Sequence, residues 1–558
     1  MRAQNWGRRL RKIFKTPLCL KGFSVTYGEF LSYMFHVERL EDARRDHDRR
    51  WPMRFRTGWD PDQPLLLPPR PDEWLSPGHL ARVVSEAVDA WDLSTAETAF
   101  HSRGPGASAY PPKLLLKLLL YGYLPQRFSS RRISEACRED LAFLWLSRLT
   151  QPKHSTIAAF RQQHSADLPG WMAQVVCLCM DLGMVGFRLG AVDGTKIHSD
   201  ASKHKAMSYQ RMKEVIPQLK KELAHWVAAH ETDAVPPAPE LPADHVERVQ
   251  ERLARIQQAK ADLEARWVLD HPDDPEPEAK AQINFTDPES AIMVTKNQGV
   301  QQAYNAQIVV DAQEGVIVGT ALSAHPHDVR EFEPALEAVE ATTGRPFAQV
   351  TADAGYFSAD NVTAANAQQV DAYIAAGSDQ WRTVKGHKLF GKGQFVYDAE
   401  TNTYQCPAHQ ELPYRGDRTE SIGGGQKRHV AVYRGERATC GACPLKDQCT
   451  ASKNKAKQLT RGADDAIRDA MKAKVRTPEG DAVYRQRQGI VEPAIGILKE
   501  TRGFRQFSMR GMEKVTGEWT LLILAFNIRK IARKLTRLAE ETGKYWTLMH
   551  LRANKPIP

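Results

Sequence analysis

The stretch Leu189-Gly-Ala-Val-Asp193-Gly-Thr-Lys196 is an apolar run that leads into an acidic residue. A second stretch, Gln349-Val-Thr-Ala-Asp353-Ala-Gly-Tyr356, has the same form. Short apolar runs bounded by polar or turn residues are typical of buried β-strands. We therefore expect Asp193 and Asp353 at the carboxyl-terminal ends of two core strands. If these strands are parallel neighbours, both carboxylates reach one cleft.

A third acidic residue, Glu492, lies in the amphipathic stretch Val491-Glu-Pro-Ala-Ile-Gly-Ile-Leu-Lys499. Because Pro493 lacks an N–H and disfavours the α conformation at the preceding residue, we expect a helix either to start near Glu492 or to kink there. Glu492 and Lys499 then face roughly the same side of that helix. Carboxylate oxygens are the ligands that Mg²⁺ prefers, and two such ions can drive phosphodiester chemistry.

The order of the predicted elements indicates the class of the core. It is strand, hairpin, helix, strand, helix, strand, which is that of a ribonuclease-H-like sheet with helices on its faces, an α/β fold. The elements are a strand at 188–193, hairpin strands at 304–311 and 316–322, a helix at 331–342, the strand ending at Asp353, a helix at 358–369 and a strand at 372–376.

The chain divides into segments of different composition. Residues 231–289, in the long helical insertion, hold 15 acidic and 6 basic residues, so we expect this segment to face solvent, away from DNA. The expected segments are a basic arm (1–60), a helical DNA-binding domain (61–185), a ribonuclease-H-like core (186–380) with a helical insertion (204–290), a β-rich, Cys-containing insertion (381–465), the C-terminal helices of the core (466–540) and a tail (541–558).

Two interpretations of the basic arm stay open. It is either a flexible segment that grips DNA, or an over-called upstream frame with the true start at Met53.

Helices dominate the segment after the arm. Ser76 is a plausible N-cap and Pro77 fits the first helical position; further helices are expected at 112–122, 130–146, 155–165 and 168–182. Part of this region is similar to a helix-turn-helix, and the alternative is a small helical bundle with solvated ends. In the helix-turn-helix interpretation the residues that face DNA are His154, Ser155, Thr156 and Arg161.

Composition indicates the kind of partner and the compartment. The formal net charge of +10 fits an anionic partner such as nucleic acid. No signal-peptide core is visible at the N-terminus, and the longest apolar runs are far shorter than the roughly 20 residues that span a bilayer. Eight cysteines in 558 residues do not form a secreted disulfide framework. We expect a cytoplasmic protein.

Four of the cysteines gather in the β-rich insertion. The run Cys440-Gly-Ala-Cys443-Pro-Leu-Lys-Asp-Gln-Cys449 contains a Cys-x₂-Cys step, which suits a tetrahedral metal, and Cys406 lies upstream. One hypothesis is a structural Zn²⁺ on these four thiols, with His409 as a possible substitute ligand. The alternative is a reduced, metal-free loop. Cys177 and Cys179 lie on an apolar helix and are expected in the core.

Several motifs occur in a fixed order along nearly the whole chain, from about residue 60 to 535. With them the chain resembles the DDE transposases of bacterial insertion sequences, in the subgroup with an InsH-like helical N-terminal domain. The motifs are Asp193-Gly-Thr-Lys-Ile197, Ala201-Ser-Lys-His-Lys-Ala-Met-Ser-Tyr209, Asp287-Pro-Glu-Ser290, Gln302-Ala-Tyr-Asn-Ala-Gln307, Val310-Asp311, Ala352-Asp-Ala-Gly-Tyr356, Tyr484 to Lys499, and Arg510-Gly-Met-Glu-Lys-Val-Thr-Gly-Glu-Trp519 leading to Asn527.

The resemblance implies roles for single residues. Asp193, Asp353 and Glu492 would be the metal-binding triad. Tyr484, Arg487 and Lys499 resemble the Tyr-Arg-Glu-Lys signature, in which Arg and Lys hold phosphates of the transposon end and Tyr packs against it. The signature places three residues between Arg and Glu, whereas four separate Arg487 from Glu492 here.

The resemblance also implies an activity. The protein would bind the inverted terminal repeats of its element, pair two ends as a homodimer, and use Mg²⁺ or Mn²⁺ to cut the DNA and join 3′-hydroxyls to a target, on the nucleoid of a bacterium. Two alternatives stay open: a ribonuclease-H-like nuclease that cuts without joining, and an inactive DNA-binding repressor derived from a transposase.

Overall fold

The computed structural model describes residues 70–98, 109–231, 245–272, 274–295, 299–384, 386–423, 426–452 and 454–543. The predicted basic arm, the alternative start at Met53 and most of the tail lie outside the described residues. Contacts divide the chain into a first unit, Met1–Glu73, and a second unit, Trp74–Pro558. A short 3-10 turn, Pro71–Trp74, lies at their boundary, and all elements below belong to the second unit.

The N-terminal part of the second unit is helical, and the prediction of a mixed α/β protein with a helical N-terminal region is confirmed. No helix in the described part of the chain is long and apolar enough to cross a membrane. The N-terminal helices are α3 (Leu80–Asp89), α4 (Ser94–Thr98), α5 (Pro112–Tyr123), α6 (Ser130–Glu139), α7 (Leu141–Leu146), α8 (His154–Gln163) and α9 (Leu168–Asp181).

Two of the predicted helix boundaries in this region are wrong, both because of capping. The first helix begins at Leu80, not at Pro77, and the imidazole of His79 accepts the Ala81 N–H as its cap. The helix predicted over 130–146 is two helices. Asp140 separates them, because its carboxylate accepts the N–H groups at the start of α7 and so competes with a continuous helix.

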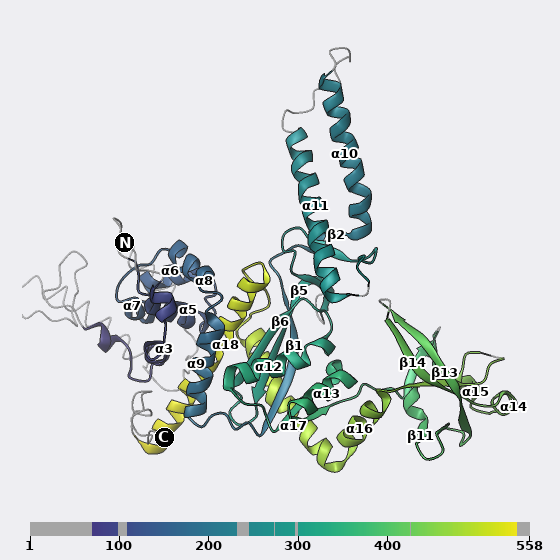
Figure 1. The fold of residues 1–558 in the computed structure, drawn as a ribbon. Helices are drawn as coiled ribbons and strands as arrows, with labels where there is room; N and C mark the ends of the chain where they lie inside the picture. The colour runs from purple at the N-terminus through teal and green to yellow at the C-terminus, as the bar shows by residue number, and fades with distance from the viewer. Residues whose placement is uncertain are drawn as a thin grey trace, which may run out of the picture. The chain divides into compact units, whose positions relative to one another are not determined.

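A six-stranded mixed sheet forms the centre of the second unit (Figure 1). Its middle strand β1 pairs antiparallel with β5 and parallel with β7, and β5 carries β6 and β4 on its other edge. The order is therefore β4-β5-β1-β7-β8, and β6 pairs with β5 at residues beyond those that pair with β4. The strands are β1 (Leu189–His198), β4 (Ala291–Thr295), β5 (Gly299–Asp311), β6 (Ile317–Ser323), β7 (Gln349–Ala352) and β8 (Asp371–Ile374).

Helices cover both faces of this sheet. Gly319 of β6 lies under Val339 of α12, whereas the next residue, Thr320, accepts a hydrogen bond from Trp519 of α18. Because successive strand residues point to opposite faces, α12 and α18 lie on opposite sides. The helices of the core are α12 (Phe332–Thr343), α13 (Ala359–Ala367), α16 (Asp465–Arg476), α17 (Pro478–Gly496) and α18 (Met512–Thr542).

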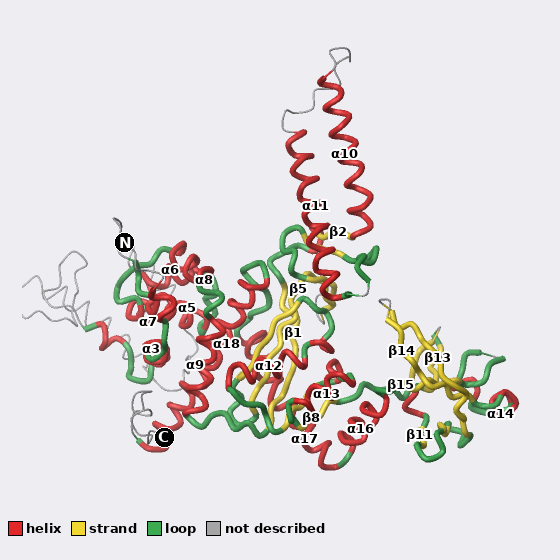
Figure 2. Tube along the Cα trace, in the orientation of Figure 1, coloured by secondary structure: helices red, strands yellow, loops and turns green. Residues whose placement is uncertain are grey.

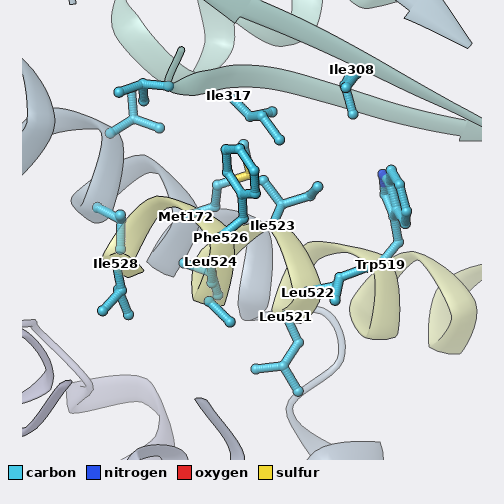
Figure 3. Close-up of a cluster of buried hydrophobic side chains, with 14 of the residues drawn as sticks. Met172, Ile308, Ile317, Trp519, Leu521, Leu522, Ile523, Leu524, Phe526 and Ile528 are labelled. Carbon is cyan, nitrogen blue, oxygen red and sulfur yellow. The ribbon is translucent and has the colours of Figure 1, made fainter. Parts of the chain in front are cut away.

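Helix α18 joins the sheet to the N-terminal helices. Figure 3 shows Phe526, Ile523 and Trp519 of α18 on the side of Ile317 and Ile308, which belong to the sheet. Met172 of α9 joins the same cluster. Each such buried side chain stabilises the fold by about 1.5–3 kcal/mol relative to exposure.

The long insertion is a pair of helices, α10 (Tyr209–Glu231) and α11 (His245–Asp270), which pack along each other (Figure 1). Met212, Ile256 and Leu263 belong to the apolar seam between them. Beside their base, the short strands β2 (Ala206–Ser208) and β3 (Gln282–Asn284) pair with each other.

A second β-rich segment precedes α16 (Figure 2). It consists of a hairpin and a five-stranded antiparallel sheet in the order β11-β12-β13-β14-β15. Its core holds Phe390, Tyr404 and Tyr433. The strands are β9 (Trp381–Val384), β10 (His387–Phe390), β11 (Val396–Asp398), β12 (Thr403–Gln405), β13 (Glu411–Gly423), β14 (Gln426–Arg434) and β15 (Gln458–Gly462).

Candidate active site

The strand register brings Asp193 and Asp353 together. The parallel ladder of β1 and β7 ends at the pair Val192–Ala352, so the next residue on each strand is one of the two aspartates. Asp353 directly follows the end of β7, where its Oδ1 accepts the Gly355 N–H at 2.8 Å and caps a short 3-10 turn. Asp193 was predicted at the end of its strand, but β1 continues to His198 because its antiparallel ladder with β5 continues.

Groups of both charge signs lie near the Asp193 carboxylate. Its side chain is 18% exposed, and its Oδ2 accepts a hydrogen bond from Arg487 Nη1 at 3.2 Å. Burial is the main cause that raises the pKa of Asp193, and the nearby charge of Asp353 raises it further, against the opposing effects of Arg487 and the Gly194 N–H. The two carboxylates therefore repel each other, and a bound cation would relieve that repulsion.

The raised pKa has a consequence for the metal-free protein. A folded-state pKa above the unfolded value gives a contribution to stability that is complete at low pH and is lost as the pH rises through the folded pKa. As the pH rises through the folded-state pKa of Asp193, we expect the wild type to lose stability relative to Asp193→Asn. We expect added Mg²⁺ to reverse this loss. Urea unfolding from pH 4 to 7, with and without Mg²⁺, measures this difference. If the free energy of unfolding changes with pH in the same way for the two proteins, the pKa of Asp193 is not raised.

Glu492 lies on α17, which packs against β1, β5 and β7. The expectation that a helix starts near Glu492 is wrong, because α17 begins at Pro478 and continues through Pro493 to Gly496. A five-residue π-helical segment, Ile497–Thr501, follows it. Burial of Val491, Ala494 and Leu498 holds this region on the sheet, which offsets the cost of about 3 kcal/mol for an internal proline.

The three acids are not gathered into one set of ligands. Glu492 is exposed on α17, next to the buried Val491. Among the described residues no three His, Cys, Asp or Glu side chains group closely enough to hold one metal ion. The structure thus brings Asp193 and Asp353 together and leaves Glu492 outside their immediate contacts.

The basic residues of the predicted signature lie against β1. Lys499, in the π-helical segment, donates from Nζ to Thr195 Oγ1 at 2.9 Å and to the Lys196 carbonyl at 3.2 Å. Arg487 reaches Asp193, and its Nε is buried without a hydrogen-bond partner among the described residues. Tyr484, half-buried, lies one helical turn before Arg487.

The predicted DNA-facing residues of α8 separate into two groups. His154 and Ser155 are exposed and Thr156 is half-buried, as a contact surface requires. Arg161 is buried, and its guanidinium donates to Tyr123 Oη and the Phe128 carbonyl and pairs with Glu518 at 3.7 Å. The expectation that Arg161 faces DNA therefore does not fit the structure, because its charge is used inside the fold.

The helix-turn-helix interpretation finds no direct support in the helix order. That motif joins its two helices by a turn of three or four residues. Here α7 and the turn after it lie between α6 and α8, although α6 and α8 are in contact.

Sequence reasoning missed a group of polar residues beside the two aspartates. Asp328 accepts hydrogen bonds from Lys196 and from Asn305 and Gln307 of β5. The available signal was the alternation of strand residues, since Lys196, Asn305 and Gln307 all occur within motifs quoted above. Asp328 itself lies in none of them.

The four cysteines of the β-rich insertion lie around one cavity of about 440 Å³, together with His409. All four are free, and the sulfur of Cys406 accepts the Gln410 N–H at 3.4 Å. Burial is the main cause that raises the pKa of Cys449, and the other three thiols raise it further. Elsewhere Cys179 is buried as expected, but Cys177 is exposed on α9, so its expected place in the core is wrong.

Two family models match the chain. One, described as Transposase domain (DUF772), matches residues 69–163, and the other, described as Transposase DDE domain, matches residues 405–532. The second match includes Glu492 and Lys499 and ends within α18. A search of curated proteins finds no match.

The two matches, in this order, show a transposase N-terminal domain followed by a transposase DDE domain, the domain of a class of enzymes that cut and transfer DNA strands with divalent metal ions. A DDE domain implies a ribonuclease-H-like core, and the described part of the chain contains a mixed sheet around β1.

Proposed function

We propose that Asp193, Asp353 and Glu492 together hold Mg²⁺ or Mn²⁺, and that the protein cuts DNA at the ends of its insertion sequence and joins the 3′-hydroxyls to a target. The observation that carries this proposal is the placement of Asp193 and Asp353 at the end of one parallel ladder. Two mutually repelling carboxylates are a donor set that fits a hard divalent cation.

Glu492 completes the site by a movement of its side chain or of α17. Its exposure leaves the carboxylate free to turn, and the π-helical segment that follows is a common feature of helices at functional sites. Bound metals would activate the attacking water or 3′-hydroxyl and stabilise the leaving oxygen.

The basic side chains would hold the DNA end. Arg487 pairs with Asp193, and we propose that it turns to a DNA phosphate when a cation binds Asp193. Lys499, fixed beside Thr195, supplies a point charge for a second phosphate. Tyr484 would pack against the end of the DNA.

The helical N-terminal region, within the proposed domain 61–185, would read the terminal repeats. Its exposed His154 and Ser155, with Thr156, are the residues we assign to this contact. Two ends would be paired by a homodimer.

An end-joining assay tests the proposal. DNA in which the element's own ends still adjoin flanking sequence is incubated with a target plasmid and either Mg²⁺ or Ca²⁺. We expect joined products with Mg²⁺ and binding without reaction in Ca²⁺. Cuts without joined products would support the nuclease alternative, and binding without any strand chemistry would support the repressor.

We further propose that Cys406, Cys440, Cys443 and Cys449 hold a structural Zn²⁺, with His409 as the alternative fourth ligand. The support is their arrangement around one cavity and the N–H donor on the Cys406 sulfur, since hydrogen bonds to ligand atoms orient them and tune the metal. Rotation of the side chains must bring the thiols closer to one another.

Metal analysis tests this zinc site. We expect about one zinc per chain in protein purified without chelator, and loss of the zinc in Cys443→Ser. Cys177→Ser, which changes an exposed cysteine on α9, is the matched control and should retain it. A wild type without zinc and with four reduced thiols would refute the assignment.

A further inference from the structure

Asp328 approaches the Asp193–Asp353 pair from the other face of β1. Asp193 and Thr195 contact α17 and the segment after it, through Arg487 and Lys499. The alternate residues of β1 point the opposite way, and there the Lys196 ammonium pairs with Asp328 Oδ1 at 2.8 Å.

A buried polar network holds Asp328 in place. Its Oδ1 also accepts from Asn305 Nδ2 at 2.7 Å and from Gln307 Nε2 at 3.2 Å. Gln307 Oε1 in turn accepts the hydroxyl of Tyr356, the third residue after Asp353. Asn305, Gln307 and Tyr356 are fully buried, so the network fixes the turn that carries Asp353.

Asn361 ties the segment of Asp328 to the same turn a second time. Its Nδ2 donates to the carbonyls of Val329 and Tyr356, both at 2.7 Å. Since Val329 follows Asp328 directly, one side chain fixes the spacing between the segments of Asp328 and Asp353.

Two glycines make room for Asp328. A Cβ at Gly194 would lie 2.4 Å from Gln307 Nε2 and 2.9 Å from Asp328 Oδ1. A Cβ at Gly355 would lie 3.0 Å from Asp353 Oδ1 and 3.4 Å from Asp328 Oδ2. The glycines that follow the two aspartates thus let a third carboxylate approach the site closely.

Neighbouring donors compensate the negative charge of Asp328. Burial works to raise the pKa of Asp328, but the donors Lys196, Asn305 and Gln307 outweigh it and hold that pKa below its ordinary value. The Lys196 side chain is only 17% exposed, and Asp328 neutralises its positive charge.

We propose that Asp328 and Lys196 form a positioning pair for the metal site, which fixes Asp353 through the Gln307–Tyr356 hydrogen bond and keeps the Lys196 charge from competing with the cation. This inference rests on the proposed function, because it assigns the pair to the site of Asp193 and Asp353.

The test is Mn²⁺ binding by the full-length protein without DNA, followed by electron paramagnetic resonance of free Mn²⁺. Asp328→Asn keeps the side-chain shape but leaves the Lys196 ammonium unpaired beside the aspartates. We expect the Mn²⁺ dissociation constant to rise about 10–100-fold, the usual effect of losing a residue that orients metal ligands.

Two further variants separate positioning from general damage. Lys196→Met combined with Asp328→Asn removes both charges, so we expect it to bind Mn²⁺ more tightly than Asp328→Asn alone. Asp465→Asn breaks a Lys392–Asp465 pair of the same 2.8 Å length outside this network, and we expect it to bind Mn²⁺ as the wild type does.

The outcomes are distinct. Wild-type affinity in Asp328→Asn, or a double variant no better than the single one, overturns the positioning pair and leaves the proposed function standing. Equal weakening in Asp465→Asn also overturns it, because the effect would then be general. A wild type that binds no Mn²⁺ at the two aspartates overturns the proposed function and this inference together.

Discussion

Asp193→Asn is expected to lower strand cleavage at the DNA ends at least about 1,000-fold, which corresponds to about 4 kcal/mol of transition-state stabilisation. The amide keeps the shape and the acceptor for the Gly194 N–H. It removes the charge that, with Asp353, would hold the cation. Because the substitution also relieves the repulsion from Asp353, the variant should fold at least as well as the wild type.

Binding and cleavage must be measured separately for this prediction. DNA-end binding in Ca²⁺ should persist in Asp193→Asn, whereas cleavage in Mg²⁺ should be lost. Asp360→Asn is the matched control: Asp360 is an exposed aspartate at the start of α13, and its variant should cleave like the wild type. Retained cleavage in Asp193→Asn would remove this residue from the chemistry.

Glu518→Ala is expected to lower the free energy of unfolding by about 3–5 kcal/mol, the usual result of breaking a buried ion pair. Glu518 is 1% exposed and pairs with the buried Arg161 at 3.7 Å. It also accepts the backbone N–H of Ser508 and of Met509 and the Ser508 hydroxyl. The variant leaves these donors and the guanidinium of Arg161 without their carboxylate.

Urea unfolding followed by tryptophan fluorescence measures this loss, since Trp519 is adjacent to the substitution. Arg161→Met in the Glu518→Ala background should recover part of the stability, because it removes the unpaired charge. Glu500→Ala breaks an exposed pair with Arg505 and should cost less than about 1 kcal/mol. If Glu518→Ala unfolds at the same urea concentration as Glu500→Ala, the ion pair is not what joins α8 to α18.

Strand periodicity was enough to predict most of the central sheet and its two aspartates. The runs that lead to Asp193 and Asp353 are apolar and short, and parallel pairing then determines that the two carboxylates are neighbours. The length of β1 could not be predicted, because it depends on its partner β5, which pairs with it as far as His198.

The error at Arg161 has a different origin. A basic residue after the polar start of a helix fits a DNA contact, and local sequence does not reveal a partner far along the chain. That partner, Glu518, lies in the motif Gly517-Glu518-Trp519 of α18. A Cβ at Gly517 would lie 2.9 Å from Ser165 Cβ, so this glycine lets α18 approach the chain just after α8.

Glu492 shows the limit of helix periodicity. The pattern placed it on the same side as Lys499, and Lys499 does reach β1. Glu492 is nevertheless exposed. A π-helical segment, Ile497–Thr501, begins between the two residues and changes the angle between residues before and after it. Whether the carboxylate binds a metal depends on attraction to the cation. The cation is not part of the chain, so sequence periodicity cannot predict this movement.

Iron-mediated cleavage of the polypeptide tests the central claim, one metal site shared by Asp193, Asp353 and Glu492. Fe²⁺ replaces Mg²⁺, and ascorbate with peroxide generates hydroxyl radicals that cut the backbone next to the bound ion. We expect cuts in β1 near Asp193, after β7 near Asp353 and in α17 near Glu492, all lost in the Asp193→Asn, Asp353→Asn double variant. Cuts at the two aspartates with none in α17, or cuts that persist in the double variant, would contradict the account.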